Sequence, residues 1–140
     1  MIRHLWTILC ARCILEANTN SVSLIDVLEN VTVSTGGQPA FQANWSLVTD
    51  WRRQDESLES RGRARIELIA PSGETIGSSP VEYDIDLATT DRARAIVAIP
   101  LMPIRGEGRY LFRISLQTQG EKEWREVFDY PLVVTLQLSA

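Results

Sequence analysis

His4, Cys10 and Cys13 are the residues of this 140-residue chain best suited to nucleophilic or metal chemistry. A catalytic histidine needs a nucleophile and an orienting carboxylate within hydrogen-bond reach, and no spacing in the sequence predicts them for the single histidine. Side chains three residues apart on a strand point to opposite faces, so the two cysteines cannot share a metal ion or bond to each other. No second cysteine pair is present to complete a zinc site. We therefore expect no catalytic residue, no metal site, no cofactor and two reduced core cysteines.

Three carboxylates, Glu82, Asp84 and Asp86, alternate along one expected strand and raise the question of a calcium site. Calcium takes six to eight oxygens that converge from loops. Carboxylates two residues apart on a strand lie roughly 7 Å from each other. We expect a solvated face paired with arginines instead.

Trp51, Arg52 and Arg53 form the one candidate partner-binding group in the sequence. They lie in a polar stretch, residues 50–60, which we interpret as a long exposed connection, the kind of segment in which function concentrates. Tryptophan and arginine are enriched in binding hot spots. The alternative is a solvated loop with Trp51 folded back on the core.

Composition places the chain among ordinary globular domains, with 44% hydrophobic and 23% charged residues. A net charge of -4 argues against nucleic-acid binding, which favours basic surfaces. Two cysteines make no disulfide scaffold, so a reducing, cytoplasmic setting is expected. An export signal over the first 15 residues is disfavoured because Arg12 interrupts the apolar run. That run is also too short to span a bilayer.

The positions of these residues depend on a pattern of short strands that begins with a hairpin. Residues 5–15 and 22–28 are apolar runs separated by a polar, asparagine-rich turn, which predicts two antiparallel strands. Both runs place apolar residues on both faces, so we expect this hairpin to lie inside the sandwich.

Alternation predicts the later strands. Phe41, Ala43, Trp45 and Leu47 share one face, as do Ala64, Ile66 and Leu68, and Tyr110, Phe112, Ile114 and Leu116. Residues 71–73 and 77–80 are expected turns or loops, and Pro131 marks an edge or a bulge. Residues 81–87 and 93–99 are predicted to form a hairpin that sets Asp86 against Arg94; strands in different sheets would contradict it. The fold class is therefore all-β: one antiparallel β-sandwich domain over residues 1–140, immunoglobulin-like or C2-like, with eight or nine strands.

The chain resembles a family of small bacterial proteins classed as domains of unknown function. The residues that carry the resemblance are Leu9-Cys10, Asn18-Thr19-Asn20, the strand 22–27, and the later segments 71–73, 108–112 and 131–134. In that family Asp commonly follows the cysteine, whereas here Ala11 does. The resemblance implies a sandwich fold and a bacterial cytoplasmic setting, and it brings no catalytic residue.

Three functional hypotheses follow. The first is a non-enzymatic protein-interaction or assembly module of a bacterial cell, which engages a protein partner or a second copy through a sheet edge or the 50–60 stretch. The second is a carbohydrate or small-ligand binder with exposed Trp51 or Trp124. The third is a hydrolase in which carboxylates meet His4 in a deep pocket.

Overall fold

The computed structural model describes residues 2–34, 37–54 and 60–137, with residues 78 and 79 described in their backbone alone. These ranges contain nine strands and no helix. The strands are β1 (Ile2–Leu15), β2 (Val22–Val27), β3 (Asn30–Val33), β4 (Ala40–Arg53), β5 (Arg61–Ile69), β6 (Thr75–Asp86), β7 (Arg92–Pro103), β8 (Gly108–Thr118) and β9 (Arg125–Leu136).

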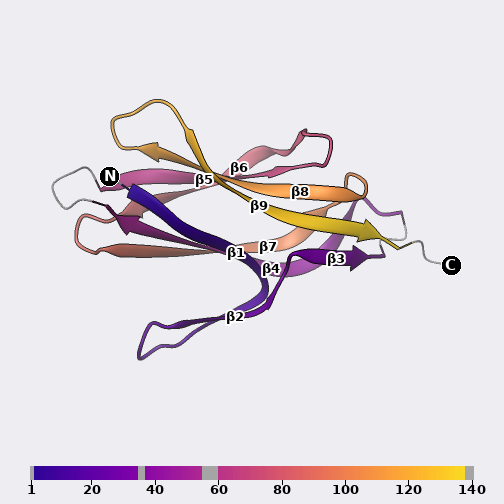
Figure 1. The fold of residues 1–140 in the computed structure, drawn as a ribbon, viewed down its shortest axis with the longest axis horizontal. Helices are drawn as coiled ribbons and strands as arrows, with labels where there is room; N and C mark the ends of the chain where they lie inside the picture. The colour runs from indigo at the N-terminus through magenta and orange to yellow at the C-terminus, as the bar shows by residue number, and fades with distance from the viewer. Residues whose placement is uncertain (1, 35–36, 55–59, 138–140) are drawn as a thin grey trace.

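The strands form two sheets that pack face to face (Figure 1). One sheet has four strands in the order β2-β1-β4-β7, and the other has five in the order β3-β9-β8-β5-β6. The predicted all-β sandwich is confirmed. One pair departs from the antiparallel pattern, because the short β3 runs parallel to β9.

The core lies between the two sheets and is filled by alternate residues of their long strands. The faces predicted from alternation in β4, β5 and β8 are confirmed: the residues named for them either belong to this core or pack against it. Pro131 lies in β9 just before Val133, where pairing of β9 with β3 begins, so this proline occupies an edge segment as predicted.

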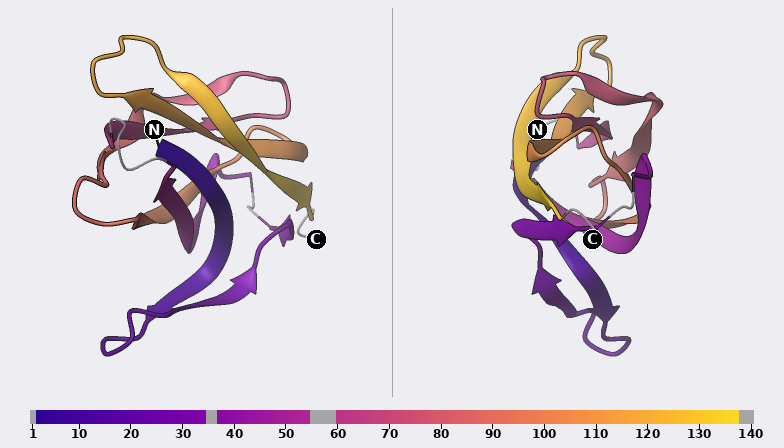
Figure 2. Two further views of the ribbon diagram at one scale, coloured as in Figure 1. Left: turned by 60° about the vertical axis from the view of Figure 1, so that its left-hand side comes forward. Right: turned by 90° about the vertical axis from the view of Figure 1, so that its right-hand side faces the viewer.

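The first hairpin forms as predicted, with Leu15 of β1 opposite Val22 of β2. The expectation that it lies inside the sandwich holds for β1 up to Cys10, since Leu9 belongs to the core, and is wrong for the rest of the hairpin. Pairing of β1 with β4 ends at Cys10. Beyond this residue the β1–β2 hairpin projects away from the other strands, toward the bottom of the views in Figures 1 and 2. Arg94 of β7 donates to the Asn20 carbonyl at its tip at 3.1 Å. Because the five-stranded sheet does not cover this part, Leu15 is 51% exposed.

The predicted hairpin of residues 81–87 and 93–99 is also wrong, because β6 and β7 lie in different sheets. Asp86 faces Arg61 of β5, and Arg94 faces Asp50 of β4. Residues 77–80, expected as a loop, lie within β6. The apolar alternation of both strands suits the inner face of either sheet, so pattern alone could not choose between them.

The polar stretch 50–60 divides into two parts. Residues 50–53 complete β4 rather than forming a connection. The five residues 55–59, which belong to the predicted exposed loop, lie outside the described residues.

Candidate interaction surface at the edge of strand β7

Trp51, Arg52 and Arg53 do not form a common surface. The Trp51 side chain is 0% exposed, and its Nε1 donates to the Tyr83 hydroxyl at 3.0 Å. The alternative in which Trp51 folds back on the core is therefore the one observed. Arg53 pairs with Asp91 at 2.8 Å, while Arg52 is exposed. A partner contact through these residues stays a prediction, in which Trp51 has no surface to offer.

Trp124, the second predicted ligand-binding tryptophan, is half-buried. The guanidinium carbon of Arg65 lies 4.4 Å from the centre of its ring, a cation–π arrangement. One face of the indole is therefore already covered by protein, and a sugar ring could stack only on what remains.

His4 is packed among aromatic rings at one end of the sandwich. Its Nε2 lies 2.7 Å from the Thr7 hydroxyl. The imidazole stacks on Phe128 with ring centres 5.0 Å apart and meets Trp51 edge-on at 5.3 Å. Burial lowers the pKa of His4, and the charge of Asp50 partly opposes this shift. These contacts are those of a structural histidine held in its neutral form.

Both cysteines are free, but only Cys10 is a buried core residue as predicted. Cys10 is buried with its Sγ 3.6 Å from the Ser46 carbonyl, and Cys13 is half-buried. Burial raises the pKa of both thiols, which disfavours the reactive thiolate.

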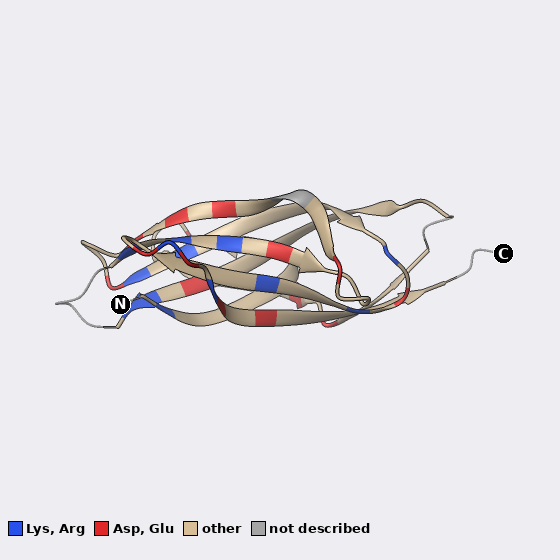
Figure 3. Cartoon of the chain, turned by 90° about the horizontal axis from the view of Figure 1, so that it is seen from above, with Lys and Arg blue, Asp and Glu red and all other residues tan. Residues whose placement is uncertain are grey.

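The carboxylate face of β6 is paired with arginines, as predicted. Arg63 contacts Glu82 at 3.3 Å and Asp84 at 3.4 Å, and Arg61 contacts Asp86 at 3.4 Å. The Ala88 backbone N–H lowers the pKa of Asp86 by donating to its carboxylate. Figure 3 shows arginines and carboxylates interleaved along the strands rather than gathered by sign.

Within the described ranges, no three His, Cys, Asp or Glu side chains are grouped so that they could hold a metal ion. In the same part of the chain, no helix has the length and apolar character needed to cross a bilayer.

Strands β6 and β7 are the outer strands of their respective sheets on one side of the sandwich. The opposite side is bridged where the chain passes from β2 to β3. There the Leu28 N–H donates to the Leu9 carbonyl at 2.8 Å and the Tyr130 hydroxyl donates to the Leu28 carbonyl at 2.6 Å. The side formed by β6 and β7 is therefore the more open of the two.

The backbone of β7 presents a regular row of hydrogen-bonding groups at its free edge. Antiparallel strands alternate between residues that bond to the neighbour and residues whose N–H and C=O point away from it. The Arg53 N–H donates to the Asp91 carbonyl at 2.9 Å, and the same register pairs Trp51 with Ala93. The odd residues of β7 are therefore bonded to β4. The free edge is formed by the N–H and C=O groups of the even residues, Arg92, Arg94, Ile96 and Ala98.

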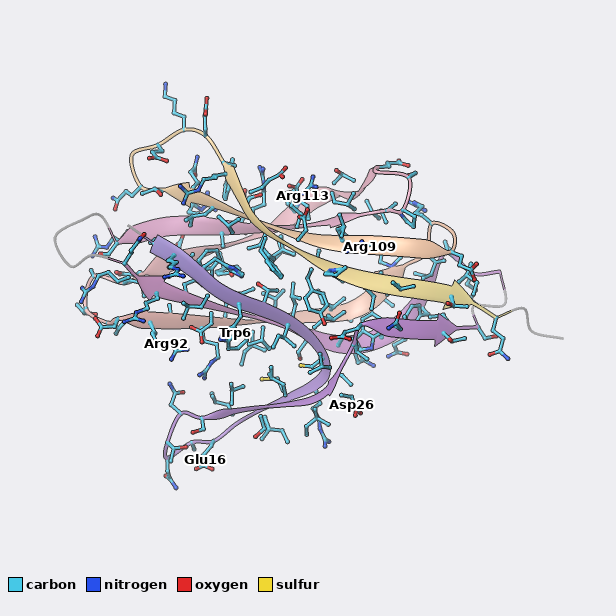
Figure 4. The ribbon with its side chains drawn as sticks, in the orientation of Figure 1. Trp6, Glu16, Asp26, Arg92, Arg109 and Arg113 are labelled. Atoms are coloured by element: carbon cyan, nitrogen blue, oxygen red, sulfur yellow. The ribbon has the colours of Figure 1, made fainter. Side chains whose placement is uncertain are left out.

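Over residues 95–99 this edge lacks the devices that usually prevent strand addition, which are prolines, charged side chains and bulges. This run contains no proline and no charged residue, and β7 pairs with β4 there without a register shift. Arg94 precedes the run and Pro100 ends it. Ile96 is 45% exposed. Arg92, the first residue of β7, is labelled in Figure 4, and its guanidinium is bound to the buried Asp50 carboxylate at 2.8 Å.

The β6 edge is protected by the same criteria. The Leu87 N–H donates to the Ser60 carbonyl at 2.8 Å. Over residues 80–86, the backbone N–H and C=O groups of the even residues of β6 therefore point away from β5. These residues are a proline, which has no N–H, and three carboxylates: Pro80, Glu82, Asp84 and Asp86. Of the two outer strands, β7 is the one open to pairing.

An apolar groove of about 450 Å³ runs between β6 and β7. Ile99 and Leu101 of β7 line one wall and Ile76 and Val81 of β6 the other. Buried Phe112 of β8 lies at its floor. A segment added along the free edge of β7 would place the side chain opposite Ile99 over this groove.

No protein-family model matches the chain, and no curated protein matches it. Among solved structures, the CooA pilin subunit from enterotoxigenic Escherichia coli is similar at 9% identity and a TM-score of 0.30, over 95% of this chain and 99% of that one. A TM-score of 0.30 is too low to support an argument from the likeness. The resemblance to a bacterial family of unknown function stays a prediction.

The sequence alone did not predict an interaction surface at Arg94, Ile96 and Ala98. The signal was present as an apolar run without proline or carboxylate from residue 95 to 99. The same run was predicted to form a hairpin with residues 81–87, and in that hairpin this edge would be hydrogen-bonded to the neighbouring strand rather than free.

Proposed function

We propose that this chain is a non-enzymatic protein-interaction module, in which the free edge of β7 accepts an extended segment of a partner. Main-chain hydrogen bonds supply affinity in such strand addition, and pockets for alternate side chains supply specificity. The observation that carries the proposal is the row of outward N–H and C=O groups on residues 92–98, with an apolar groove that begins at Ile99. We further propose a reducing, bacterial cytoplasmic setting, in keeping with two free cysteines.

The test removes one edge donor and leaves the fold intact. Ala98→Pro deletes an N–H that faces outward, so no bond to β4 is lost and the substitution suits an edge strand. Ala98→Val keeps the donor and serves as the matched control. A peptide library displayed on phage is selected against the wild-type protein, and recovered peptides are measured against both variants.

The expected result is a set of peptides that bind the wild-type protein and Ala98→Val but lose at least about tenfold in affinity for Ala98→Pro. A tenfold loss corresponds to about 1.4 kcal/mol, the scale of one or two main-chain hydrogen bonds. If all recovered peptides bind the two variants equally, the β7 edge is not the binding site and the proposal fails.

A small apolar ligand is the second candidate, because the groove volume of about 450 Å³ falls within the range of ligand pockets. This version of the predicted ligand binder uses neither Trp51 nor Trp124, since neither residue lines the groove. A screen with an environment-sensitive apolar dye separates the two functions. The ligand-binding function is favoured if the dye binds Ala98→Pro and the wild type with equal affinity and no selected peptide depends on the β7 edge.

A further inference from the structure

The geometry points to the chemistry of the partner segment, an inference that rests on the proposed function. We infer that the β7 edge selects an extended, antiparallel segment of about six residues. In this segment, aliphatic side chains alternate with polar ones and the last position carries an Asp or Glu that faces Arg94. This pattern follows from the inner and outer faces of the added strand and from the positive charge of Arg94.

The register assigns each partner residue to a face. Cross-strand neighbours project to the same side of a sheet. Partner residues opposite Ala95, Val97 and Ile99 therefore point inward, because Val97 and Ile99 pack against the core. Partner residues opposite Arg94, Ile96 and Ala98 lie on the outer face of the four-stranded sheet.

The inward positions must be aliphatic. The position opposite Ile99 would cover the groove, which is lined by Ile66, Leu68 and Phe112 together with residues of β6 and β7. The positions opposite Ala95 and Val97 would continue the inner face of β7, where Val97 packs against the core. The one charged residue of the groove, Glu67, already pairs with Arg65 at 3.5 Å. A charged partner side chain buried here would have no counter-ion, which is costly. An aliphatic side chain would gain about 25 cal/mol for each Å² of apolar surface removed from water.

The outer position opposite Arg94 favours a carboxylate. Asp50 lies opposite Arg94 in the strand register, and its carboxylate is bonded to Arg92 at 2.8 Å. Arg94 donates one NH group to the Asn20 carbonyl, and its Nε is buried with no hydrogen-bond partner in the described ranges. One carboxylate therefore faces two arginines here, and an acid from the partner would supply a second negative charge.

A second copy of β7 does not satisfy these requirements. Its residues 92–103 include no Asp or Glu. Its inward side chains Val97 and Ile99 already pack against their own core, so they could not cover the groove of another copy. The partner is therefore a segment that is not already part of a sandwich.

Antiparallel pairing fixes the direction of the pattern. All strand pairs of the four-stranded sheet are antiparallel, and this pairing is slightly the more stable per residue. Read from its N-terminus, the partner then passes Ile99 first and Arg94 last, which places the acid at the C-terminal end. Leu-Thr-Val-Thr-Val-Glu fits this pattern and serves as the probe.

The experiment measures fluorescence anisotropy of this hexapeptide, labelled and flanked by Gly-Ser, on the full chain. Three further peptides carry Lys in place of the Glu, the same residues with the alternation shifted by one, or the sequence reversed. The proteins are the wild type, Arg94→Gln, Arg94→Lys, Ala98→Pro and Ala98→Val, each checked for an unchanged thermal midpoint.

We expect the Glu-to-Lys change in the peptide and Arg94→Gln in the protein each to weaken binding about threefold to tenfold, the scale of a partly exposed ion pair. The Lys peptide should bind Arg94→Gln at least as tightly as the wild type, because the like charge opposite it is gone, and Arg94→Lys should recover part of the loss seen with the Glu peptide. The shifted and reversed peptides should bind at least tenfold more weakly.

The outcomes separate the two proposals. Suppose that Ala98→Pro abolishes peptide binding, whereas Arg94→Gln leaves it unchanged and the shifted peptide binds as well as the original. The β7 edge is then the binding site, and the inferred pattern of the partner segment is overturned. No binding of the hexapeptide, when library peptides do bind at the edge, overturns it as well. Concentration-dependent dimerisation of the wild type that Ala98→Pro abolishes would show that the occupant is a second copy. Equal binding of every peptide to Ala98→Pro and Ala98→Val overturns the proposed function itself.

Discussion

Trp51 combines a large buried surface with two hydrogen bonds inside the core. Its Nε1 donates to the Tyr83 hydroxyl at 3.0 Å and to the Thr49 hydroxyl at 3.3 Å, and the two hydroxyls also bond to each other. Burial raises the pKa of Tyr83, so this group stays neutral over the physiological range. The indole therefore completes a small polar network in which each member has a partner.

Substitutions at Trp51 should separate its packing from its hydrogen bonding. Trp51→Phe should lower the free energy of unfolding by about 1–2 kcal/mol, since the two hydroxyls can still bond to each other. Trp51→Ala should cost about 3–5 kcal/mol through the cavity that it leaves. Urea denaturation followed by far-ultraviolet circular dichroism measures both. Equal losses in the two variants would contradict this division. Because Trp51 is buried, changing residues 51–53 together to alanine would test folding rather than a partner contact.

His4 should make stability depend on pH. Burial holds its folded-state pKa below the ordinary value of 6.5, so the unfolded chain binds more protons between the two values. The free energy of unfolding contributed by neutral His4 is then fully present above about pH 6.5 and declines as the pH falls below it. Urea denaturation between pH 5 and 8 should show this decline, and His4→Gln should reduce it. An unchanged slope in His4→Gln would assign the decline to other groups.

At the scale of elements, β5 approaches β8 and β1 closely at Gly62. A Cβ at this position would lie 2.7 Å from the Gln117 backbone oxygen and 3.2 Å from Cδ1 of Ile2. The first of these neighbours belongs to the paired backbone of β8, which cannot move without disturbing the ladder between the two strands.

Gly62→Ala should therefore destabilise the protein, although it would relieve the entropic cost of glycine in a strand. We expect a loss of roughly 1–3 kcal/mol from overpacking. The thermal midpoint and the urea midpoint measure it, with Ala64→Gly on the same strand as a cavity-forming comparison. A Gly62→Ala protein as stable as the wild type would mean that β5 and β8 can separate locally without cost.

The edge strands differ in how they are protected, and this difference places the interaction surface. On β6 a proline and three carboxylates occupy the outward positions of residues 80–86. On β7 the outward backbone groups between residues 92 and 98 lie beside Arg94, whose cross-strand neighbour Asp50 is already bonded to Arg92, and beside the exposed Ile96. Protection of one edge and exposure of the other is what a strand-accepting module requires.

At the scale of the whole molecule, most strand pairs join segments that are distant in sequence. β1 pairs with β4, β4 with β7, β5 with β8 and β3 with β9. Each such pairing requires closure of a long loop before its contacts form.

We therefore expect slow folding, on the millisecond-to-second timescale typical of all-β domains. Stopped-flow refolding from urea, followed by the fluorescence of the buried Trp51, measures the rate. The Trp51→Phe protein identifies the contribution of this residue to the signal. Refolding complete within microseconds would show that local contacts dominate instead.

The sequence by itself determined most of the strands and their core-facing residues, although residues 50–53 and 77–80 were expected outside strands. The alternation of Tyr110, Phe112, Ile114 and Leu116 identified β8 and its buried face, because the twofold period of a strand is a local property. The pairing of Glu82 and Asp84 with arginines was expected because carboxylates two residues apart on a strand lie too far from each other to share a calcium ion.

Only the tertiary structure decided which strands are neighbours and which edges remain free. Residues 81–87 and 93–99 have patterns that would fit a hairpin, yet β6 pairs with β5, where Arg61 and Arg63 meet its carboxylates. Nor could local pattern show that the first hairpin leaves the sandwich after Cys10, or that residues 92–98 keep an unpaired edge. Pairing depends on contacts between segments far apart in the chain, and the candidate surface on β7 is a consequence of that pairing.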